Sequence, residues 1–582
     1  MKEISHCFQR THCFEIKLLM ENQFDVIVIG SGISGGWAAK EFCDLGFKTL
    51  VLERGRFVEH ISDYPTAMKE SWEMEQRGAL TAKTIQENPV LSRCYAYSDF
   101  TKHLFVPDNA HPYIQEKPFD WIRGYHLGGK GLMWARQVQR WSNNEFISPK
   151  RDGYGSLSWP ITYKDLAPWY AQVEKFIGVS GNKDGLEEVP DGEFLKAWEM
   201  NAAEISIKEK IKTHFPERTP IIGRCAHLTE VKEIHQKQGR NACMARTRCE
   251  RGCPLGAYFS SNSSTLPWAE KTGNLTIHTN QIVAGIVYDP KTKKASGVET
   301  IDRHSKKKQR FASKVIFVNA ATINTNAILL NSKSEAFPYG LGNSNGNLGK
   351  YLAFHNYRGK VNATFKGNLD SYYYGRRPTS IMIPNFRNIK GNDVNFKGGY
   401  LINYTASREG WGRTIENGDA YGTNYVEQAA KPGPWSVHMY MQGETIPIKE
   451  NEVRLSQQVD QYGIPSPILN VDYTANDEKM TIDFLEQASE MLRKAGCENI
   501  QQVDSKQAPG LDIHEMGGVR MGEDPSVAVT NSHNQLHDCK NVFVTDGACM
   551  TSTGTKNPSL TFMAMTARAA NFAADQMKQG LL

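Results

Sequence analysis

The first clear pattern in the chain is a short run of apolar, largely β-branched residues at positions 24–29. Such a run predicts a strand buried in a parallel sheet. A glycine-rich turn follows at residues 30–35, and residues 36–42 then carry a helical pattern. A second apolar strand is expected at residues 48–52 and ends at Glu53. Strand, glycine turn, helix, strand and terminal acid together predict a dinucleotide-binding unit.

Each glycine of this turn has a physical role. Gly30 permits the tight turn, Gly32 lets the backbone approach a pyrophosphate, and Gly35 lets the helix pack closely against the strand. The amino end of the helix then faces the phosphate charge. Glu53 lies about twenty residues further on, where a carboxylate can bind ribose hydroxyls. These features allow either NAD or FAD.

Further blocks of the chain bear on the choice between NAD and FAD. One lies at residues 121–134 and contains Gly128 and Gly129, where a flavin would rest against the first unit. Further blocks lie near the C-terminus, at residues 514–522, 541–548 and 557–561 and at the helical residues 562–570.

Residues 360–475 have a different character, rich in Tyr, Asn, Gly and aromatics. Strand-like pieces such as residues 435–441, with turn signals at residues 431–434 and 462–465, predict an inserted antiparallel sheet. Aromatic and polar side chains on a sheet face suit a carbohydrate pocket, and ordinary sheet packing is the alternative. Glu444 is a candidate buried carboxylate facing such a pocket, with a surface strand end as the alternative.

Length and composition set limits on these interpretations. At 582 residues, two large domains or one domain with a large insertion are expected. Apolar residues make up 40% and charged residues 23%, which fits a folded globular protein and not a disordered one. The net charge of +5 is small for this length, and no basic stripe carries interleaved aromatics, so no nucleic-acid partner is expected. Lys306, Lys307 and Lys308 are interpreted as a solvated hairpin tip.

The chain contains no window of about 18 uninterrupted apolar residues, so no transmembrane helix is expected. Residues 1–19 lack the apolar stretch of a secretory signal. Met20 stands just before the first strand, so the upstream segment is interpreted as an over-called start or a tail. The cytoplasm is the default compartment, and export to the periplasm with a signal-bearing partner is the alternative.

From Asp25 onwards, the chain resembles the glucose–methanol–choline (GMC) oxidoreductase family. Within it, the chain is most similar to the large subunits of bacterial gluconate, fructose and glucoside dehydrogenases, with pyranose oxidase as a further relative. The blocks that carry the resemblance are the glycine turn at residues 30–35, the Gly128-Gly129 loop, residues 314–321, residues 348–355 and the C-terminal His–Asn block.

The resemblance implies an α/β fold: a Rossmann-like FAD-binding domain with an inserted α+β substrate domain that carries an antiparallel sheet. Residues 24–359 and 476–582 would form the FAD domain from discontinuous segments, after an N-terminal tail at residues 1–23. The substrate-binding domain would comprise residues 360–475 with parts of residues 60–120 and 150–220.

The resemblance also implies the position of the FAD site. Some family members link FAD covalently through a histidine in the loop after the second glycine pair. Met133 occupies that place here, and a thioether cannot form the bond, so non-covalent FAD is expected. The cofactor-binding residues expected on this basis are Gly30, Ser31, Gly32, Gly35, Glu53, Arg54, Gly128, Gly129, Met133, Val283, Ala320, Asp546, Gly547, Asn557, Pro558 and Ser559.

Hydride removal from a carbinol carbon requires the hydroxyl proton to leave nearly in step, and a neutral imidazole with a pKa of about 6.5 can accept it. By its position in the family motif, His514 is the expected base. Asn557 is its expected partner and orients the substrate oxygen towards the flavin. Asn557 before Pro558 also suits a helix N-cap, and both roles can hold together. His126 and His355 are interpreted as structural.

The eleven cysteines are scattered except for Cys243, Cys249 and Cys253, with Cys225 upstream. Related sugar dehydrogenases carry a cysteine-rich stretch here, and in some of them it ligates an iron–sulfur cluster. The Cys-x₃-Cys spacing fits such a cluster, but the first spacing is longer and an adjacent cysteine pair is absent. Reduced, partly buried thiols are the preferred interpretation, and the cluster is the alternative.

The resemblance therefore implies an FAD-dependent oxidoreductase acting on CH–OH groups, and in particular a sugar or glycoside dehydrogenase that oxidises a C3 hydroxyl. Electrons would pass to a quinone, a cytochrome or a partner subunit, so a small subunit and a cytochrome are expected partners. An oxygen-using sugar oxidase of the pyranose-oxidase type is the alternative. A non-redox flavoprotein, such as a lyase on this fold, is a third interpretation.

Overall fold

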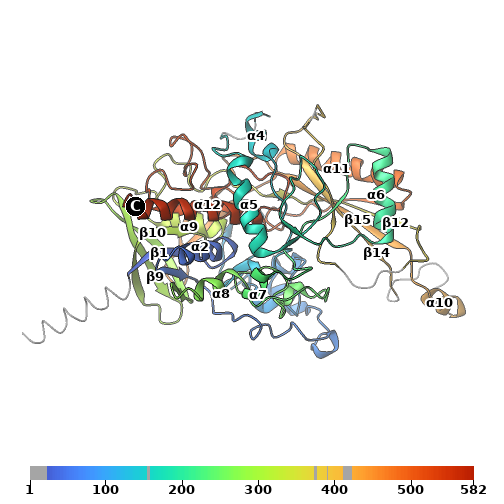
Figure 1. Ribbon diagram of the computed structural model, residues 1–582, viewed down its shortest axis with the longest axis horizontal. Helices are drawn as coiled ribbons and strands as arrows, with labels where there is room; N and C mark the ends of the chain where they lie inside the picture. The colour runs from blue at the N-terminus through green and yellow to red at the C-terminus, as the bar shows by residue number, and fades with distance from the viewer. Residues whose placement is uncertain are drawn as a thin grey trace, which may run out of the picture.

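The computed structural model describes residues 23–582 except residues 152, 154–156, 372–376, 390, 393 and 411–421. The tail expected at residues 1–23 lies outside this range apart from its last residue. Two large sheets lie towards opposite ends of the longest axis, each with its own helices (Figure 1). No helix in the described part of the chain has the length and apolar character needed to cross a membrane.

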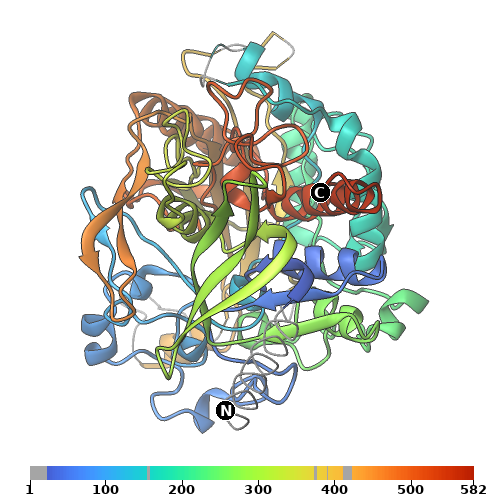
Figure 2. The ribbon, with the colours of Figure 1, turned by 90° about the vertical axis from the view of Figure 1, so that its left-hand side faces the viewer.

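The first sheet has seven strands in the order β7-β2-β1-β10-β9-β8, with β19 paired to β10. β1, β2, β7, β10 and β19 pair in parallel, whereas β8, β9 and β10 pair as antiparallel neighbours. Figure 2 looks onto the end of the molecule that carries this sheet, beside the red helix α12. The strands are β1 (Gln23–Ile29), β2 (Thr49–Leu52), β7 (Leu275–His278), β8 (Gln281–Asp289), β9 (Lys294–Asp302), β10 (Lys308–Val318) and β19 (Val542–Val544).

Apart from Gln23 and Asp25, the residues of β1 are apolar because both faces of the strand are buried. Val26 and Val28 pack into one cluster with α2 (Ile33–Asp44) and the end of α12 (Ser559–Lys578), and Ile27 and Ile29 pack into another. The predicted buried parallel strand is thus confirmed. The lysine-rich hairpin tip is confirmed as well, since the three lysines are exposed where β9 turns into β10.

The second sheet is antiparallel, in the order β18-β12-β15-β14-β13-β6, with β11 paired to β15. Side chains at alternate positions of β12, β14 and β15 pack into an apolar cluster with two helices, α6 (Ala202–His214) and α11 (Ala475–Lys494). The strands are β6 (Ile221–Ile222), β11 (His355–Asn356), β12 (Gly359–Phe365), β13 (Ile381–Ile383), β14 (Tyr400–Arg408), β15 (Trp435–Glu444) and β18 (Glu498–Asp504).

The strand pairing differs from the expected domain boundaries at two places. α11 and β18 lie beyond residue 475, yet β18 pairs with β12, and the apolar face of α11 covers the sheet. In contrast, β16 (Glu452–Val459) and β17 (Pro465–Asn470) pair with each other and with β3 (Ile114–Gln115). Residues 452–470 therefore lie outside the second sheet. Val453 and Leu469 pack instead into an apolar cluster with Ile323 of α9 (Thr322–Asn331).

The remaining strands and α-helices lie outside the two large sheets. They are β4 (Val179–Ser180), β5 (Phe194–Leu195), α3 (Ala82–Glu87), α4 (Asn143–Arg151), α5 (Tyr163–Ile177), α7 (Glu233–Lys237), α8 (Thr265–Glu270), α9 (Thr322–Asn331) and α10 (Gly422–Ala429).

Candidate active site

A cavity of about 1080 Å³ is lined by residues of both large sheets. One part of its lining is the glycine turn after β1 together with residues 129–137. Another part is the polar face of the second sheet, and loop residues 511–515 and 557–559 complete it. A volume of this size suits a bound cofactor together with a small substrate.

The glycine turn connects β1 to α2 within very little space. Gly30 has φ of 95°, a left-handed conformation that glycine adopts without strain. A Cβ atom on Gly35 would lie 1.9 Å from the carbonyl oxygen of Gly30, so only glycine lets α2 start so close to β1. A Cβ on Gly32 would meet nothing within 4 Å, and Gly32 lines the cavity. The amino end of α2 is therefore open to an anionic ligand.

Glu53 lies at the end of β2 and also lines the cavity. Its Oε2 accepts a hydrogen bond from Ser31 Oγ at 2.6 Å, and its Oε1 accepts one from the Gly55 N–H at 2.8 Å. Burial raises the pKa of this carboxyl, and these hydrogen bonds partly oppose the rise. The predicted acid is thus fixed beside the glycine turn.

His514 and Asn557 meet although 43 positions separate them in the chain. Asn557 Nδ2 lies 3.4 Å from His514 Nε2, and both residues line the cavity. The expected N-cap role of Asn557 is wrong, because α12 begins at Ser559 and its N-cap is Pro558. The carboxamide is directed at the imidazole instead.

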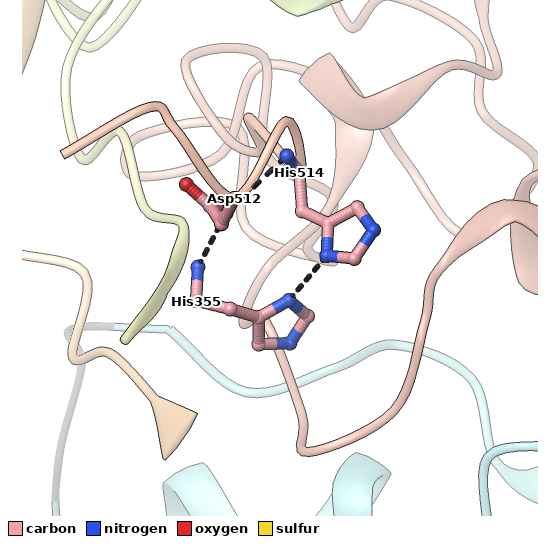
Figure 3. Close-up of side chains that lie close together, drawn as sticks. All are labelled: His355, Asp512 and His514. Carbon is pink, nitrogen blue, oxygen red and sulfur yellow. Dashed lines mark hydrogen bonds between the residues drawn. The ribbon is translucent and has the colours of Figure 1, made fainter. Parts of the chain in front are cut away.

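His355 lies directly beside His514 (Figure 3), so the purely structural interpretation of His355 needs correction. The two Nδ1 atoms are 2.9 Å apart, and His355 Nε2 lies 3.1 Å from the carbonyl oxygen of Gly554. Asp512 Oδ2 accepts the backbone N–H of His355 at 2.9 Å and that of His514 at 3.2 Å. One carboxylate oxygen thus holds both backbones in place.

The imidazoles of this group are neutral at physiological pH. Burial, followed by the neighbouring His355 and Lys130, lowers the pKa of His514 well below its usual value. Burial lowers the pKa of His355 to about 4. A neutral imidazole beside an amide donor in a cavity can accept a proton from a bound hydroxyl group.

Two segments of the chain, residues 78–357 and 447–566, match the N-terminal and C-terminal models of the family described as GMC oxidoreductase. Together the two segments cover more than half of the chain. The chain belongs to the GMC oxidoreductase family. Membership makes it a flavoprotein, an FAD-dependent oxidoreductase acting on CH–OH donors.

Individual GMC relatives resemble nearly the whole chain. The chain is 26% identical over 580 residues to 2-methyl-1,2-propanediol dehydrogenase of Mycolicibacterium austroafricanum, covering 95% of each protein. It is 24% identical over 576 residues to the fructose dehydrogenase large subunit of Gluconobacter japonicus, covering 96% of this chain and 98% of that protein. The crystal structure of pyridoxine 4-oxidase from Mesorbium loti has the same fold, with a TM-score of 0.57 and 15% identity over 94% of this chain and 98% of that one.

The cavity fits FAD, the cofactor of GMC enzymes. Apart from Gly35 and Gly128, which pack behind it, every residue expected to bind the cofactor lines the cavity. The amide oxygen Oδ1 of Asn319, another lining residue, is buried without a hydrogen-bond partner among the described residues. A buried polar atom without a partner indicates a missing ligand or water. The glycine turn, Glu53 and the start of α12 would hold the dinucleotide.

One face of the second sheet forms a polar wall of this GMC cavity. Alternation along β12, β14 and β15 sends apolar side chains to the helices behind and polar side chains to the cavity. Tyr440 pairs with Lys360 on one side and Asn403 on the other, and His438 pairs with Thr405. The polar wall consists of Lys360, Asn403, Thr405, Ser407, His438, Tyr440 and Gln442.

Sequence reasoning missed two groups around the His514–Asn557 pair. His355 ends the block at residues 348–355 that carried part of the family resemblance, and this was the available signal. Lys130, between Gly129 and Gly131, donates to Glu515 Oε2 at 2.8 Å beside His514. Its position in a glycine-rich loop at the cavity was the corresponding signal.

Two other predicted residues have no place in the cavity lining. His126 is buried, with both ring nitrogens facing backbone carbonyls of Leu104 and Leu127 at 3.0–3.1 Å, so its structural interpretation is supported. Glu444 ends β15 and is 3% exposed, so the surface strand end is wrong. It is buried as expected but does not face the cavity.

The cysteines singled out in the sequence come together. Cys243, Cys249 and Cys253 line one small cavity together with the buried imidazole of His227. Burial raises the pKa of Cys249 to about 11, so this thiol is protonated in the metal-free protein. An iron–sulfur cluster would need these three thiolates on one loop. Three reduced thiols can line the same cavity, so both interpretations stay predictions. Iron and acid-labile sulfide analysis of protein purified without oxygen distinguishes them.

Proposed function

We propose that this GMC enzyme is an FAD-dependent dehydrogenase of sugars or glycosides. The observation that supports this most directly is the meeting of the His514 imidazole and the Asn557 amide in a cavity bounded by the polar wall. A base beside a hydrogen-bond donor suits proton removal from an alcohol. A wall of hydroxyl, amide and ammonium groups suits a polyhydroxylated substrate.

FAD, His514 and Asn557 have separate roles in this reaction. Bound FAD supplies the hydride acceptor. His514 Nε2 takes the proton of the substrate hydroxyl, a contribution of about 10²–10⁴ in rate for general bases. Asn557 Nδ2 donates to the same oxygen and holds the reacting carbon in place. The depressed pKa of His514 keeps the base neutral, so activity should persist at pH values below the usual imidazole pKa.

Three finer features complete the proposal. FAD is bound non-covalently, because the thioether of Met133 lines the cavity where some relatives have a linking histidine. The oxidised position is the C3 hydroxyl of a glycoside, a preference that rests on the family resemblance. Electrons pass to a quinone, a cytochrome or a partner subunit, which is supported by a relative named as a large subunit.

The test is anaerobic flavin reduction. Purified holoenzyme is mixed with gluconate, fructose, glucose or glycosides, and bleaching of the flavin band at about 450 nm is followed. We expect bleaching with at least one sugar. His514→Ala should abolish the bleaching while the protein keeps its FAD. His304→Ala, the same change at an exposed histidine outside the cavity, is the matched control and should reduce at the wild-type rate.

Each other outcome has a definite meaning. Wild-type reduction rates in His514→Ala would refute the assignment of the base. Turnover of a substrate without flavin bleaching would indicate a lyase, and bleaching by simple diols alone would remove the sugar assignment. Stoichiometric peroxide in air would identify an oxidase. Flavin that stays in the pellet after acid precipitation would refute non-covalent binding.

A further inference from the structure

We propose that His355 is a positioning residue that holds His514 in the one neutral tautomer whose Nε2 can accept the substrate proton. This inference rests on the proposed function, since it takes His514 as the base. It assigns a role to a buried imidazole that the proton transfer itself does not use.

The tautomer of His355 follows from its partner on the far side. His355 Nε2 lies 3.1 Å from the carbonyl oxygen of Gly554, and a carbonyl oxygen can only accept a hydrogen bond. Nε2 therefore carries the hydrogen. Burial keeps the pKa of His355 at about 4, so near pH 7 the ring has one hydrogen and its Nδ1 has a lone pair.

The tautomer of His514 follows in turn. The 2.9 Å between the two Nδ1 atoms is a hydrogen-bond distance, and such a bond needs one donor and one acceptor. Because His355 Nδ1 accepts, His514 Nδ1 must donate. The single hydrogen of neutral His514 is then on Nδ1, which leaves a lone pair on Nε2, the atom that faces the Asn557 amide. The hydrogen bonds run from His514 through His355 to Gly554.

Asp512 keeps this arrangement in register. Its Oδ2 accepts the backbone N–H groups of both His355 and His514, so the two ring-bearing segments are held by one oxygen atom (Figure 3). The rings cross at 86° with centroids 5.0 Å apart, which places an edge nitrogen of one ring against that of the other. The contact is therefore specific to one pair of atoms.

A metal ion is the competing explanation for three potential ligands in one place. Ligand atoms of His355, Asp512 and His514 all lie within 4.8 Å of one another. Two imidazole nitrogens bound to one tetrahedral zinc ion at about 2.0–2.1 Å would lie about 3.4 Å apart. The observed 2.9 Å is shorter and matches an N–H···N hydrogen bond. A metal on Nδ1 would also leave the hydrogen on Nε2 and remove the base.

Two substitutions at position 355 separate the tautomer from mere packing. In His355→Gln, the carboxamide oxygen can accept from His514 Nδ1 and the carboxamide nitrogen can donate to Gly554. We expect sugar-driven flavin reduction within about tenfold of wild type. His355→Phe fills a similar volume without an acceptor, so we expect the reduction rate to fall about 10²–10⁴-fold with little change in the dissociation constant of the sugar. The flavin spectrum and melting temperature of each variant report whether it is folded.

The tautomer itself can be observed by ¹⁵N NMR of holoenzyme labelled at its histidines. The His514 signals are assigned by their absence in His514→Asn. We expect a protonated Nδ1 and an unprotonated Nε2 in wild type and in His355→Gln, with the preference lost in His355→Phe. Equal rates in the Gln and Phe variants, a protonated Nε2 in wild type, or a stoichiometric metal removed by chelation would overturn the proposal.

This experiment keeps the two proposals apart. If no sugar reduces the flavin, the proposed function fails, but the NMR measurement still reports the tautomer. If sugars reduce the flavin and Nε2 proves to be protonated, the function stands and the role of His355 fails.

Discussion

The glycine turn and the polar wall bound the same cavity in opposite ways. At the turn, the residues contribute by having no side chain, so that α2 starts within contact of β1 and its amino end opens to a phosphate. At the wall, alternate residues of three strands contribute polar groups that only their side chains provide. One region works through backbone and space, and the other works through side-chain chemistry.

This difference predicts opposite sensitivities to substitution. An added methyl group should be damaging at the turn, where a Cβ on Gly35 would overlap the carbonyl oxygen of Gly30. The same gain in size should matter little at the wall, where the cavity leaves room. Loss of a polar atom should be damaging at the wall and should matter little at the turn.

The largest effect is therefore expected from Gly35→Ala. The new Cβ at 1.9 Å from the Gly30 oxygen forces α2 away from β1, at a cost of about 1–3 kcal/mol or more for overpacking. We expect protein purified without bound flavin and with a lower melting temperature, measured by absorbance and by circular dichroism.

Gly32→Ala is the matched control for this prediction. Its Cβ meets nothing within 4 Å, so the fold should be retained and only flavin affinity should fall, because the methyl group enters the space open to the phosphate. Full flavin content and an unchanged melting temperature in Gly35→Ala would break the comparison.

The glycine turn was predictable because all its determinants are local. Strand, turn, helix and Glu53 follow one another within about thirty residues, and the backbone geometry of the turn itself requires the glycines. The same holds for β1, whose apolar run reports burial on both faces. The family resemblance added His514 and Asn557, which no local pattern would have paired.

What the sequence did not predict depends on long-range pairing. His355 meets His514 across 159 positions, because β11 adds to β15 and Asp512 holds both backbones. The place of residues 476–504 was missed for the same reason. α11 has an ordinary amphipathic pattern, and only the pairing of β18 with β12 shows which sheet it covers.

An intermediate effect is expected behind the polar wall, at Asp477 in the first turn of α11. Burial raises the pKa of this carboxyl to about 6, above the unfolded value of about 3.9. The folded protein therefore binds this proton more tightly, and the resulting stability is present at low pH and lost as the pH rises from about 4 to about 6. A shift of about two pKa units corresponds to about 3 kcal/mol.

Asp477→Asn removes this titration and keeps an oxygen that can accept from the Thr474 N–H and Oγ. We expect its stability to gain on wild type as the pH rises from 4.5 to 7, measured as urea midpoints across that range. Glu486→Gln, at an exposed position of the same helix, should follow wild type at every pH. Unchanged sugar affinity of Asp477→Asn at pH 7 would show that α11, behind the polar wall, can be altered without changing the face of the sheet that lines the cavity. Parallel midpoints for wild type and Asp477→Asn would contradict the prediction.

The smallest expected effect is at the front of the wall and tests its chemistry alone. Thr405→Val keeps the shape of a side chain that lines the cavity opposite His438 and removes one hydroxyl group. Loss of one hydrogen bond to a sugar, about 0.5–1.5 kcal/mol, should raise KM about 2- to 10-fold and leave flavin content unchanged. Thr364→Val is the same change at a position of β12 outside the cavity lining, and its KM should equal that of wild type. If both variants shifted KM equally, or neither did, the wall would act by shape, as the glycine turn does, and the contrast between the two regions would fail.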